Sequence, residues 1–373
     1  MSHKRVELEY DMSRYIAIFI AAMSLLCSFA NAAQKDGAFA IHRGTNISHW
    51  LSQSNARGEQ RQRYFTEKDV EFIASLGFDH LRLPVDEEQL WDEAGNKEPE
   101  AFTLLHSAIG WCQKKNLRVV VDLHILRSHH FNEAVKPLWT DPKAQDKFFA
   151  LWRDLSAELK KYPVSLVAYE LMNEPVADDA ELWNKLVEVL VRQIRQDEPH
   201  RKIVIGSNKW QSTDTFDQLR IPPGDRDIIL SFHFYTPMLI THHMASWTDV
   251  GKYKGPVNYP GQLVDPNEIA KLDEETARIV KRNNGIYNRD KLESLLAKPL
   301  ALAKKLDLPL YCGEWGALST VPREARMQWY RDVRANLEKH NIAWANWDYR
   351  GGFGFVGRGN QPDQEFIKVL LGE

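Results

Sequence analysis

The chain has 373 residues, of which 43% are hydrophobic and 27% are charged. This is the composition of a globular protein with enough apolar residues for a sizeable core. The formal net charge of -3 gives no sign of binding to nucleic acid or to an acidic membrane surface. Length alone suggests two or three domains, although a (β/α)₈ barrel can run to about 250 residues or more as one domain.

The N-terminal segment has the features of a secretory signal peptide. Arg14 supplies a positive charge, residues 15–29 are mostly apolar, and Ala30-Asn31-Ala32 fits the small-x-small pattern of a cleavage site. Met12 is a second candidate for the start, because the residues before it are polar and unusual ahead of a signal. We predict that residues 1–32 are removed on export.

Two other interpretations of this segment are weaker. A membrane anchor would need about 20 apolar residues, and the apolar stretch is shorter. A lipoprotein signal would place a small residue before its cysteine, whereas Leu26 precedes Cys27. We therefore expect residues 33–373 to form a single secreted or periplasmic domain with no membrane segment.

Neither a disulfide nor a metal site is expected in the mature chain. Cys112 falls in a predicted outer helix and Cys312 in a predicted inner strand, so the two thiols should not meet. Four loop histidines lack a Glu or Cys partner at a familiar ligand spacing, and we expect them to be solvated or to face substrate. They are His129, His130, His242 and His243.

Eight short apolar runs alternate with longer amphipathic segments. The runs are rich in Val, Ile, Leu and aromatic residues, as buried parallel strands are. The predicted strands are 39–46, 80–85, 118–124, 166–173, 202–207, 228–235, 310–315 and 342–348. The predicted helices are 66–76, 99–115, 142–161, 179–197, 212–219, 290–305, 323–340 and 364–371. Eight strand–helix units predict one closed parallel barrel, a (β/α)₈ TIM barrel.

The connection after the sixth predicted strand is unusually long. About fifty residues separate it from the next helix, and loops of that length are usually functional or carry structure of their own. In a barrel this loop lies on the C-terminal face, where active sites are built. Its aromatic and histidine residues are His242, His243, Trp247, Tyr253 and Tyr259.

Two glutamates stand at the ends of the fourth and seventh predicted strands. They lie in Asn173-Glu174-Pro175 and in Gly313-Glu314-Trp315-Gly316. Strands four and seven face each other across a barrel mouth, so both side chains can reach one substrate. A single such glutamate could equally form a salt bridge, but a facing pair fits hydrolysis of a glycosidic bond, which needs two carboxyl groups. A separation of about 5–5.5 Å would give retention of configuration and a wider one inversion.

With these motifs the chain resembles glycoside hydrolase family 5, the cellulase and mannanase family of (β/α)₈ retaining hydrolases. The resemblance spans essentially the whole of residues 33–373, which would then be the catalytic domain. It implies that Glu174 is the acid/base and that Glu314 is the nucleophile. It also implies substrate-binding roles for Arg82, His124, Asn173, His233, Tyr235 and Trp347.

Each implied role has an independent physical reason. Glu174 must change its protonation state, so its pKa has to lie near the working pH, and a negative Glu314 beside it would raise that pKa. Arg82 could hold the charge of Glu314, with Tyr235 donating a hydrogen bond. His233 and Tyr235 are two residues apart, which puts both side chains on one face of a strand.

Some assignments stay open at this point. Trp50 could line a subsite or simply pack, and Trp344 competes with Trp347 for the position of the sugar platform. By strand parity Asp122 and Glu170 face the barrel interior, with His80 or Arg82 as their partner. The same parity would place Cys312 inward beneath Glu314.

Another motif has little weight. The run from Gly352 to Gly357 matches G-x-G-x-x-G, but only sixteen residues follow it, too few for a dinucleotide-binding unit.

Together with this resemblance, the sequence predicts a retaining β-glycoside hydrolase that acts by double displacement. The resemblance also favours internal cleavage of β-1,4-glucan, because glucan is the commonest substrate of the family. No cofactor or metal is expected, and the only partner expected is a polysaccharide or oligosaccharide bound by a monomer. The alternatives are a β-mannanase, a xyloglucanase or an exo-acting β-1,3-glucanase, the last if the long loop blocks one end of the cleft. A carbohydrate-binding barrel without catalysis is more remote, because neither carboxylate is replaced.

Overall fold

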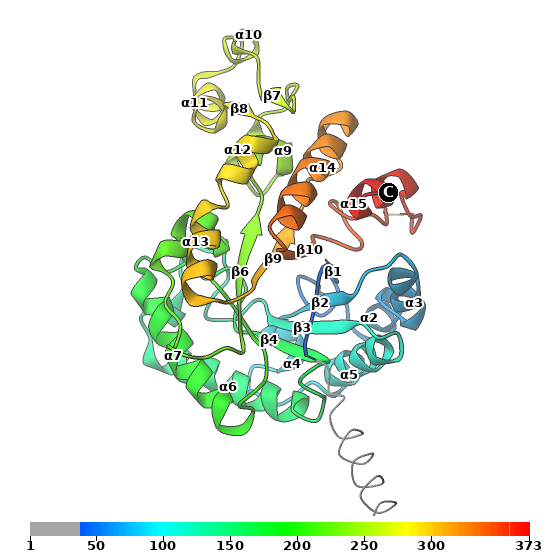
Figure 1. Ribbon diagram of the computed structural model, residues 1–373, viewed down its shortest axis with the longest axis vertical. Helices are drawn as coiled ribbons and strands as arrows, with labels where there is room; N and C mark the ends of the chain where they lie inside the picture. The colour runs from blue at the N-terminus through cyan, green and yellow to red at the C-terminus, as the bar shows by residue number, and fades with distance from the viewer. Residues whose placement is uncertain (1–37, 358) are drawn as a thin grey trace, which may run out of the picture.

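The computed structural model describes residues 38–357 and 359–373 and contains a closed barrel of eight parallel strands (Figure 1). Each strand pairs with the next in the order β1-β2-β3-β4-β5-β6-β9-β10, and β10 pairs with β1. The strands are β1 (Arg43–Asn46), β2 (His80–Val85), β3 (Arg118–Leu123), β4 (Val167–Glu170), β5 (Ile203–Gly206), β6 (Ile228–Phe234), β9 (Leu310–Trp315) and β10 (Ala343–Asn346). The predicted (β/α)₈ barrel is confirmed, whereas the predicted signal peptide, 1–32, lies outside the described residues.

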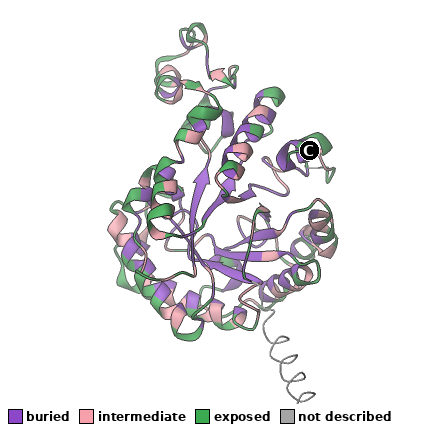
Figure 2. Cartoon of the chain, viewed as in Figure 1, coloured by how far each residue is buried: buried purple, intermediate pink, exposed green. Residues whose placement is uncertain are grey.

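Helices surround the barrel with one face buried and the other exposed (Figure 2). The long ones are α3 (Glu67–Ser75), α5 (Pro99–Lys114), α6 (Pro142–Leu159), α7 (Ala180–Asp197), α13 (Ala297–Leu306), α14 (Arg323–Lys339) and α15 (Gln364–Leu371). The short ones are α2 (Gly58–Tyr64), α4 (Glu87–Leu90), η1 (Pro137–Trp139), α8 (Asn208–Gln211), η2 (Thr213–Gln218) and α12 (Arg289–Ser294). Among the described residues, no helix is both long enough and apolar enough to span a bilayer.

Local chemistry explains where several helices begin and end. Thr66 caps α3 in a capping box with Asp69, and Gly77 takes a φ of 85° just after the helix, as expected for a stop. The predicted helix 290–305 is two helices, because Pro299 has no N–H to donate to the preceding turn and its ring crowds the carbonyl there. The predicted helix 212–219 is instead the 3₁₀ turn η2.

The long connection after β6 has a structure of its own and projects from the barrel at the top of Figure 1. Its elements are α9 (Met238–Thr241), η3 (Asp249–Lys252), β7 (Gly261–Gln262), α10 (Pro266–Ile269), α11 (Glu274–Asn283) and β8 (Ile286–Tyr287). The two short strands form an antiparallel pair. Side chains tie this insertion to the barrel helices: the Tyr259 hydroxyl donates to Asp332 on α14 across 2.6 Å.

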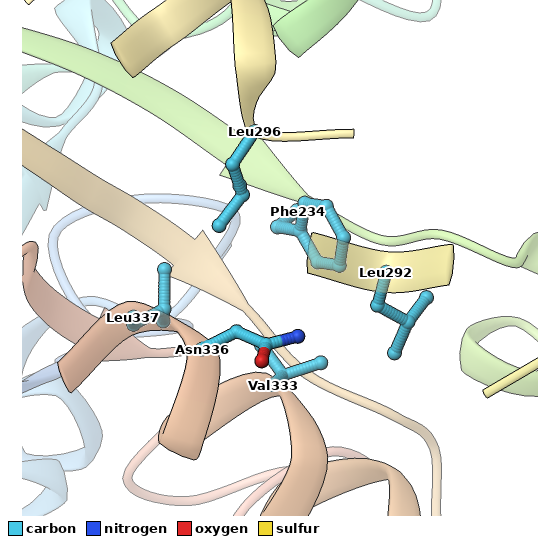
Figure 3. A pocket seen from close by; sticks show the side chains of 6 residues that line it. All are labelled: Phe234, Leu292, Leu296, Val333, Asn336 and Leu337. Carbon is cyan, nitrogen blue, oxygen red and sulfur yellow. The ribbon is translucent and has the colours of Figure 1, made fainter. Parts of the chain in front are cut away.

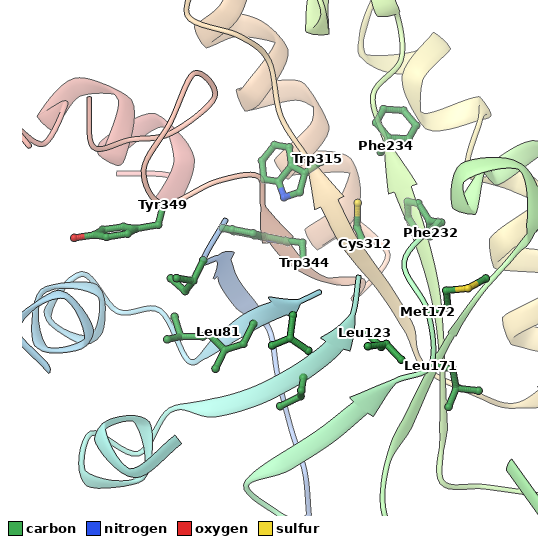
Figure 4. Packing of buried hydrophobic residues seen from close by; sticks show 14 of the residues in the cluster. Leu81, Leu123, Leu171, Met172, Phe232, Phe234, Cys312, Trp315, Trp344 and Tyr349 are labelled. Atoms are coloured by element: carbon green, nitrogen blue, oxygen red, sulfur yellow. The ribbon is translucent and has the colours of Figure 1, made fainter. Parts of the chain in front are cut away.

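Most of the apolar core lies in two clusters. The larger one fills the space between the strands and the outer helices and includes Trp315, Trp344 and Phe232 (Figure 4). The smaller one closes the interior of the barrel with one side chain from each of β3, β4, β5, β6, β9 and β10 and with Phe39 from the segment before β1. Its members are Phe39, Val120, Ala168, Val204, Ile229, Tyr311 and Ala345. The remaining interior positions are therefore free to carry polar groups.

A gap in the larger core lies between β6, α12 and α14 (Figure 3). It is lined by Phe234, Leu292, Leu296, Val333, Asn336 and Leu337. The gap encloses about 170 Å³ between atoms but has no room for a water-sized molecule. It is a packing feature, and the polar chemistry of the molecule has to be sought elsewhere.

Candidate active site

Arg82 on β2 is the centre of a buried charge cluster inside the barrel. Its guanidinium lies 2.7 Å from Glu314, 2.6 Å from Glu170 and 3.0 Å from Asp122, and none of these side chains is more than 6% exposed. Buried charges need such partners. The expectation that Arg82 pairs with Asp122 and Glu170 is confirmed. His80, the alternative partner, contacts Asp79 and Tyr311 instead.

Glu314 reaches this cluster because β9 contains an irregularity. Phe232 on β6 pairs with Cys312, but the next residue, His233, pairs with Glu314, so Gly313 is an extra residue. A bulge of this kind reverses the alternation of side chains and turns one toward a site. Asn46 on β1 supports the bulge by donating to the Gly313 carbonyl at 2.9 Å.

The bulge corrects one expectation. Cys312 was predicted to face inward beneath Glu314, but it packs outward in the larger core (Figure 4). The parity rule failed because it assumes an uninterrupted strand. Cys112 and Cys312 are both buried free thiols.

Glu174 follows β4 and faces Glu314 across His233. The His233 Nδ1 lies 2.9 Å from Glu174 Oε1 and 3.6 Å from Glu314 Oε2. One side-chain atom from each of these three residues lies within 4.8 Å of the other two. The Tyr235 hydroxyl donates to Glu314 Oε2 across 2.9 Å. The site therefore holds two close carboxyl groups with different partners.

Burial and charge shift the titration of these groups. Burial raises the pKa of Glu174 well above its usual value, and the neighbouring Glu314 raises it further. Burial also raises the pKa of Glu314, but Arg82 and the Tyr235 hydrogen bond oppose that shift. Burial lowers the pKa of His233 well below its usual value, with Arg82 and His124 adding to the effect. His233 is therefore neutral, and Glu174 favours the protonated form more strongly than Glu314 does.

Three further predicted residues lie around the carboxyl pair. His124 bonds Asp122 through Nδ1 at 2.7 Å and stacks on Trp347, with ring centroids 5.6 Å apart and planes 9° apart. Burial lowers the pKa of His124 to about 3, which makes it neutral. Asn173 accepts a hydrogen bond of 2.9 Å from Arg82 through its side-chain oxygen. Every residue that the resemblance implied thus lies in this one region.

The structure distinguishes Trp344 in β10 from Trp347 just after it. Trp347 packs with Tyr235 and Phe353 in a small cluster beside the site. Trp344 is fully buried in the larger core, where it packs edge-on against Trp315 with centroids 5.2 Å apart. Trp344 is therefore a core residue, and Trp347 keeps the predicted platform position.

Of the two roles considered for Trp50, the structure supports packing and contradicts the lining of a subsite. Trp50 is only 1% exposed, its indole N–H donates to the Arg61 carbonyl at 2.9 Å, and its ring packs 5.1 Å from that of Phe65. Both its polar group and its faces are occupied, so the side chain packs in the core and offers no surface to a sugar. The sequence did not separate these two roles because both suit an aromatic residue after a strand.

Two loop histidines also have structural roles. His129 Nε2 accepts a hydrogen bond from the Val176 N–H at 3.2 Å, and burial lowers the pKa of His129 to about 3. The ring nitrogens of His243 lie 3.1 and 2.9 Å from the carbonyl oxygens of Thr320 and Gly255. His242 differs, because its ring contacts Tyr235 and the exposed Trp247.

Sequence reasoning missed two residues that support the site. Asn46 joins Arg82 to the bulge at Gly313. Gln211, at the end of α8, accepts a hydrogen bond from the Glu174 backbone N–H at 2.9 Å. Asn46 could have been found from its place at a strand end. Gln211 could not, because its position depends on the path of a loop that sequence patterns do not specify.

Comparisons with known proteins agree with this geometry. The model of the family "Cellulase (glycosyl hydrolase family 5)" matches residues 36–352. Endoglucanase C of Acetivibrio thermocellus is 32% identical over 336 residues, which cover 88% of this chain and 97% of that protein. Cellodextrinase A of Ruminococcus flavefaciens is 28% identical and covers 81% of this chain and 84% of its own length.

The fold agrees as well. Structures of Cel5A from Thermotoga maritima, solved with cellobiose and with mannotriose, superimpose with a TM-score of 0.72 at 22% identity, covering 88% of this chain and 97% of that protein. At this identity the likeness concerns the barrel alone. The family match and the identity to endoglucanase C go further, and they show that this chain belongs to glycosyl hydrolase family 5 and is a glycosidase that hydrolyses O-glycosyl bonds.

Proposed function

We propose that the protein is a retaining β-glycoside hydrolase in which Glu314 is the nucleophile and Glu174 the acid/base. The observation that carries the proposal is the short separation of the two carboxyl groups, which have oxygens within 4.8 Å of each other. Retaining enzymes hold their carboxyl groups about 5–5.5 Å apart, whereas inverting enzymes need roughly 6.5–9.5 Å to admit a water molecule. The spacing here leaves no such room.

In the first step, Glu314 attacks the anomeric carbon while Glu174 gives its proton to the glycosidic oxygen. The bond to the leaving sugar breaks, and a glycosyl ester of Glu314 forms. In the second step, Glu174 takes a proton from water, and the resulting hydroxide attacks the anomeric carbon. Glu314 leaves as a carboxylate, so the two inversions give net retention.

The neighbours of each carboxyl group suit these unequal roles. Arg82 and Tyr235 donate to Glu314 and favour its charged form, which is the form that attacks. Among the described residues no cation donates to Glu174, and burial together with the charge of Glu314 favours its protonated form. Forming the ester removes that charge, so the pKa of Glu174 falls when it has to act as a base. Neither step requires a metal, and activity should survive treatment with EDTA.

We infer that the substrate is β-1,4-glucan, cleaved internally. The support is the names of the relatives, since endoglucanase C and cellodextrinase A both act on this class of glycan by name. β-Mannan is the first alternative, because a barrel of the same fold has been solved with mannotriose. Xyloglucan and β-1,3-glucan are further alternatives. We also infer that the chain acts as a monomer outside the cytoplasm, after loss of the predicted signal peptide.

Two measurements test this function. Proton NMR of cello-oligosaccharide hydrolysis reports the anomer formed first: the β-anomer supports retention, and the α-anomer would overturn it. A polysaccharide panel with sized products then identifies the glycan. On barley glucan an endo enzyme lowers viscosity early, whereas an exo enzyme releases sugar while viscosity hardly changes. Sugar binding without any hydrolysis across the panel would favour a non-catalytic barrel.

A further inference from the structure

Gln211 connects the main chain of Glu174 to the charge cluster inside the barrel. The side chain is fully buried, and its amide oxygen accepts a hydrogen bond from the Glu174 N–H at 2.9 Å. Its amide nitrogen donates to Glu170 Oε1 at 3.2 Å and to Ser231 Oγ at 3.1 Å. One side chain from the β5 loop thus bonds groups that belong to β4, to the loop after β4 and to β6.

The hydrogen bonds of Gln211 require an unfavourable backbone conformation at this residue and its neighbours. Lys209, Trp210 and Gln211 have φ values of 54°, 62° and 51°, and Glu174 itself has a φ of 46°. The left-handed region is disfavoured for residues with a side chain, and three such residues in succession are rare. Non-glycine residues persist there only when the surrounding structure holds them, and such strain clusters at active sites.

Gly206 provides the space that the Gln211 side chain occupies. A Cβ added at Gly206 would lie 2.2 Å from Gln211 Cγ and 2.3 Å from Gln211 Nε2. No side chain larger than hydrogen fits at position 206 while Gln211 keeps its place. The buried position of Gln211 therefore depends on a glycine at the end of the neighbouring strand.

Further hydrogen bonds fasten the β5 loop to the segment that carries Glu174. The Asn208 side chain accepts from the Ala177 N–H and donates to the Ala177 carbonyl, each at 2.9 Å. The backbone N–H of Trp210 donates to the Pro175 carbonyl at 3.3 Å. These bonds join the two loops, and Gln211 is their contact with the barrel interior.

We propose that Gln211 is a positioning residue for proton transfer by Glu174. The proposal rests on the acid/base role assigned to Glu174 above. Proton transfer requires the carboxyl group to lie within hydrogen-bond reach of the glycosidic oxygen. The bond to the Glu174 N–H holds the strained main chain that carries this carboxyl group. The bond from Gln211 to Glu170 connects that main chain to the charge cluster that also binds Glu314.

A positioning role of this kind has a signature that general structural damage lacks. Loss of acid catalysis matters for a leaving group of high pKa, which needs a proton, and hardly for one that departs as a stable anion. The probe is a series of aryl β-cellobiosides whose phenols differ in pKa, with kcat/KM measured for each. Gln211→Met should lower kcat/KM by roughly 10²-fold for the poorest leaving group and far less for 2,4-dinitrophenol.

Gly206→Ala provides a second variant, because it displaces the Gln211 amide without changing its chemistry. It should steepen the dependence of kcat/KM on leaving-group pKa in the same direction as Gln211→Met. Gln218→Met is the matched control, since Gln218 is exposed in the adjoining turn. Tyr169→Phe controls for stability, because it removes a buried hydrogen bond to Glu198 away from the site. Both controls should leave the slope unchanged.

Equal losses on all leaving groups in both variants would overturn the positioning role and leave the proposed function standing. An unchanged slope in folded Gln211→Met and Gly206→Ala would also overturn it. The wild-type enzyme tests the proposed function separately: failure to hydrolyse any β-glycoside in the series or in the polysaccharide panel would refute the function itself.

Discussion

Arg82 lies 2.7 Å from Glu314 while the same guanidinium also binds Glu170 and Asp122. One buried cation is therefore shared by three carboxyl groups, of which only Glu314 is assigned to the chemistry. Glu170 and Asp122 hold the guanidinium in place, and the guanidinium stabilises the charged form of Glu314. This arrangement makes the charge of Glu314 depend on residues that never touch the substrate.

Arg82→Lys should shift the acidic side of the pH–rate profile. Lysine keeps the charge but loses the fork that reaches several carboxylates at once. Arg82 lowers the pKa of Glu314, so a weaker contact lets that pKa rise. Glu314 is then protonated at higher pH, and kcat/KM should fall more at acidic than at neutral pH. Arg201→Lys is the control, because Arg201 is equally buried and paired with Glu198. An unmoved acidic limb would contradict this account.

Glu314→Gln should abolish turnover, retain sugar binding and lower the pKa of Glu174. The negative charge of Glu314 raises that pKa, and the amide removes the charge at nearly constant shape. Carbon NMR titration of labelled glutamate carboxyl groups can follow Glu174, with Glu174→Gln identifying its signal. Binding of cello-oligosaccharides is measured by calorimetry. Hydrolysis at the wild-type rate would refute the assignment of the nucleophile.

Glu174→Ala should lose activity mainly on poor leaving groups. General acid catalysis contributes about 10²–10⁴-fold, and activated aryl glycosides do not need it for the first step. Azide should then accelerate the second step, because a small anion can enter the space left by the carboxylate and attack without a base. The expected product is a β-glycosyl azide. Glu324→Ala, at an exposed position of α14, should neither lose activity nor respond to azide.

Trp247→Ala should weaken the use of long substrates more than short ones. Trp247 is 56% exposed, and its ring lies 6.2 Å from that of His242, which contacts Tyr235 of the site. An exposed aromatic face at this distance suits stacking with a sugar unit remote from the cleaved bond. KM should rise for cellohexaose and stay constant for an aryl cellobioside. Ile286→Ala, at an exposed position in the same insertion, controls for general effects, and equal changes on both substrates would contradict the role.

The barrel could be predicted from the sequence because its strands are continuous apolar runs. β2 and β9 have the predicted bounds, since both faces of a barrel strand are buried and the polarity changes abruptly at its ends. Glu174 and Glu314 could be selected because chemistry lies where barrel strands end. The inward orientation of Asp122 and Glu170 followed from the alternation of side chains along regular strands, which left His80 and Arg82 as the candidate partners.

The wrong orientation of Cys312 and the omission of Gln211 both come from departures from regular geometry, whereas the open role of Trp50 has another cause. The inward turn of Glu314 and the outward turn of Cys312 come from one extra residue at Gly313, which alternation cannot foresee. Gln211 reaches Glu174 because three successive residues adopt the left-handed conformation, and none of them is a glycine that would indicate this conformation in the sequence. The role of Trp50 stayed open because an aromatic side chain that packs and one that binds a sugar look the same in a sequence.

The connection that holds the insertion, followed by α12 and α13, leaves the barrel at β6 and re-enters it at β9, and these two strands are hydrogen-bonded neighbours. Its ends are therefore fixed by the barrel itself, and the entropic cost of closing such a loop grows only slowly with its length. A designer could exchange this segment for a shorter or longer one without cutting a strand pair or moving Glu174 or Glu314. The insertion can thus be replaced while the two catalytic glutamates stay in place, and enzymes with other preferences for substrate length could be designed by grafting a new segment between β6 and β9.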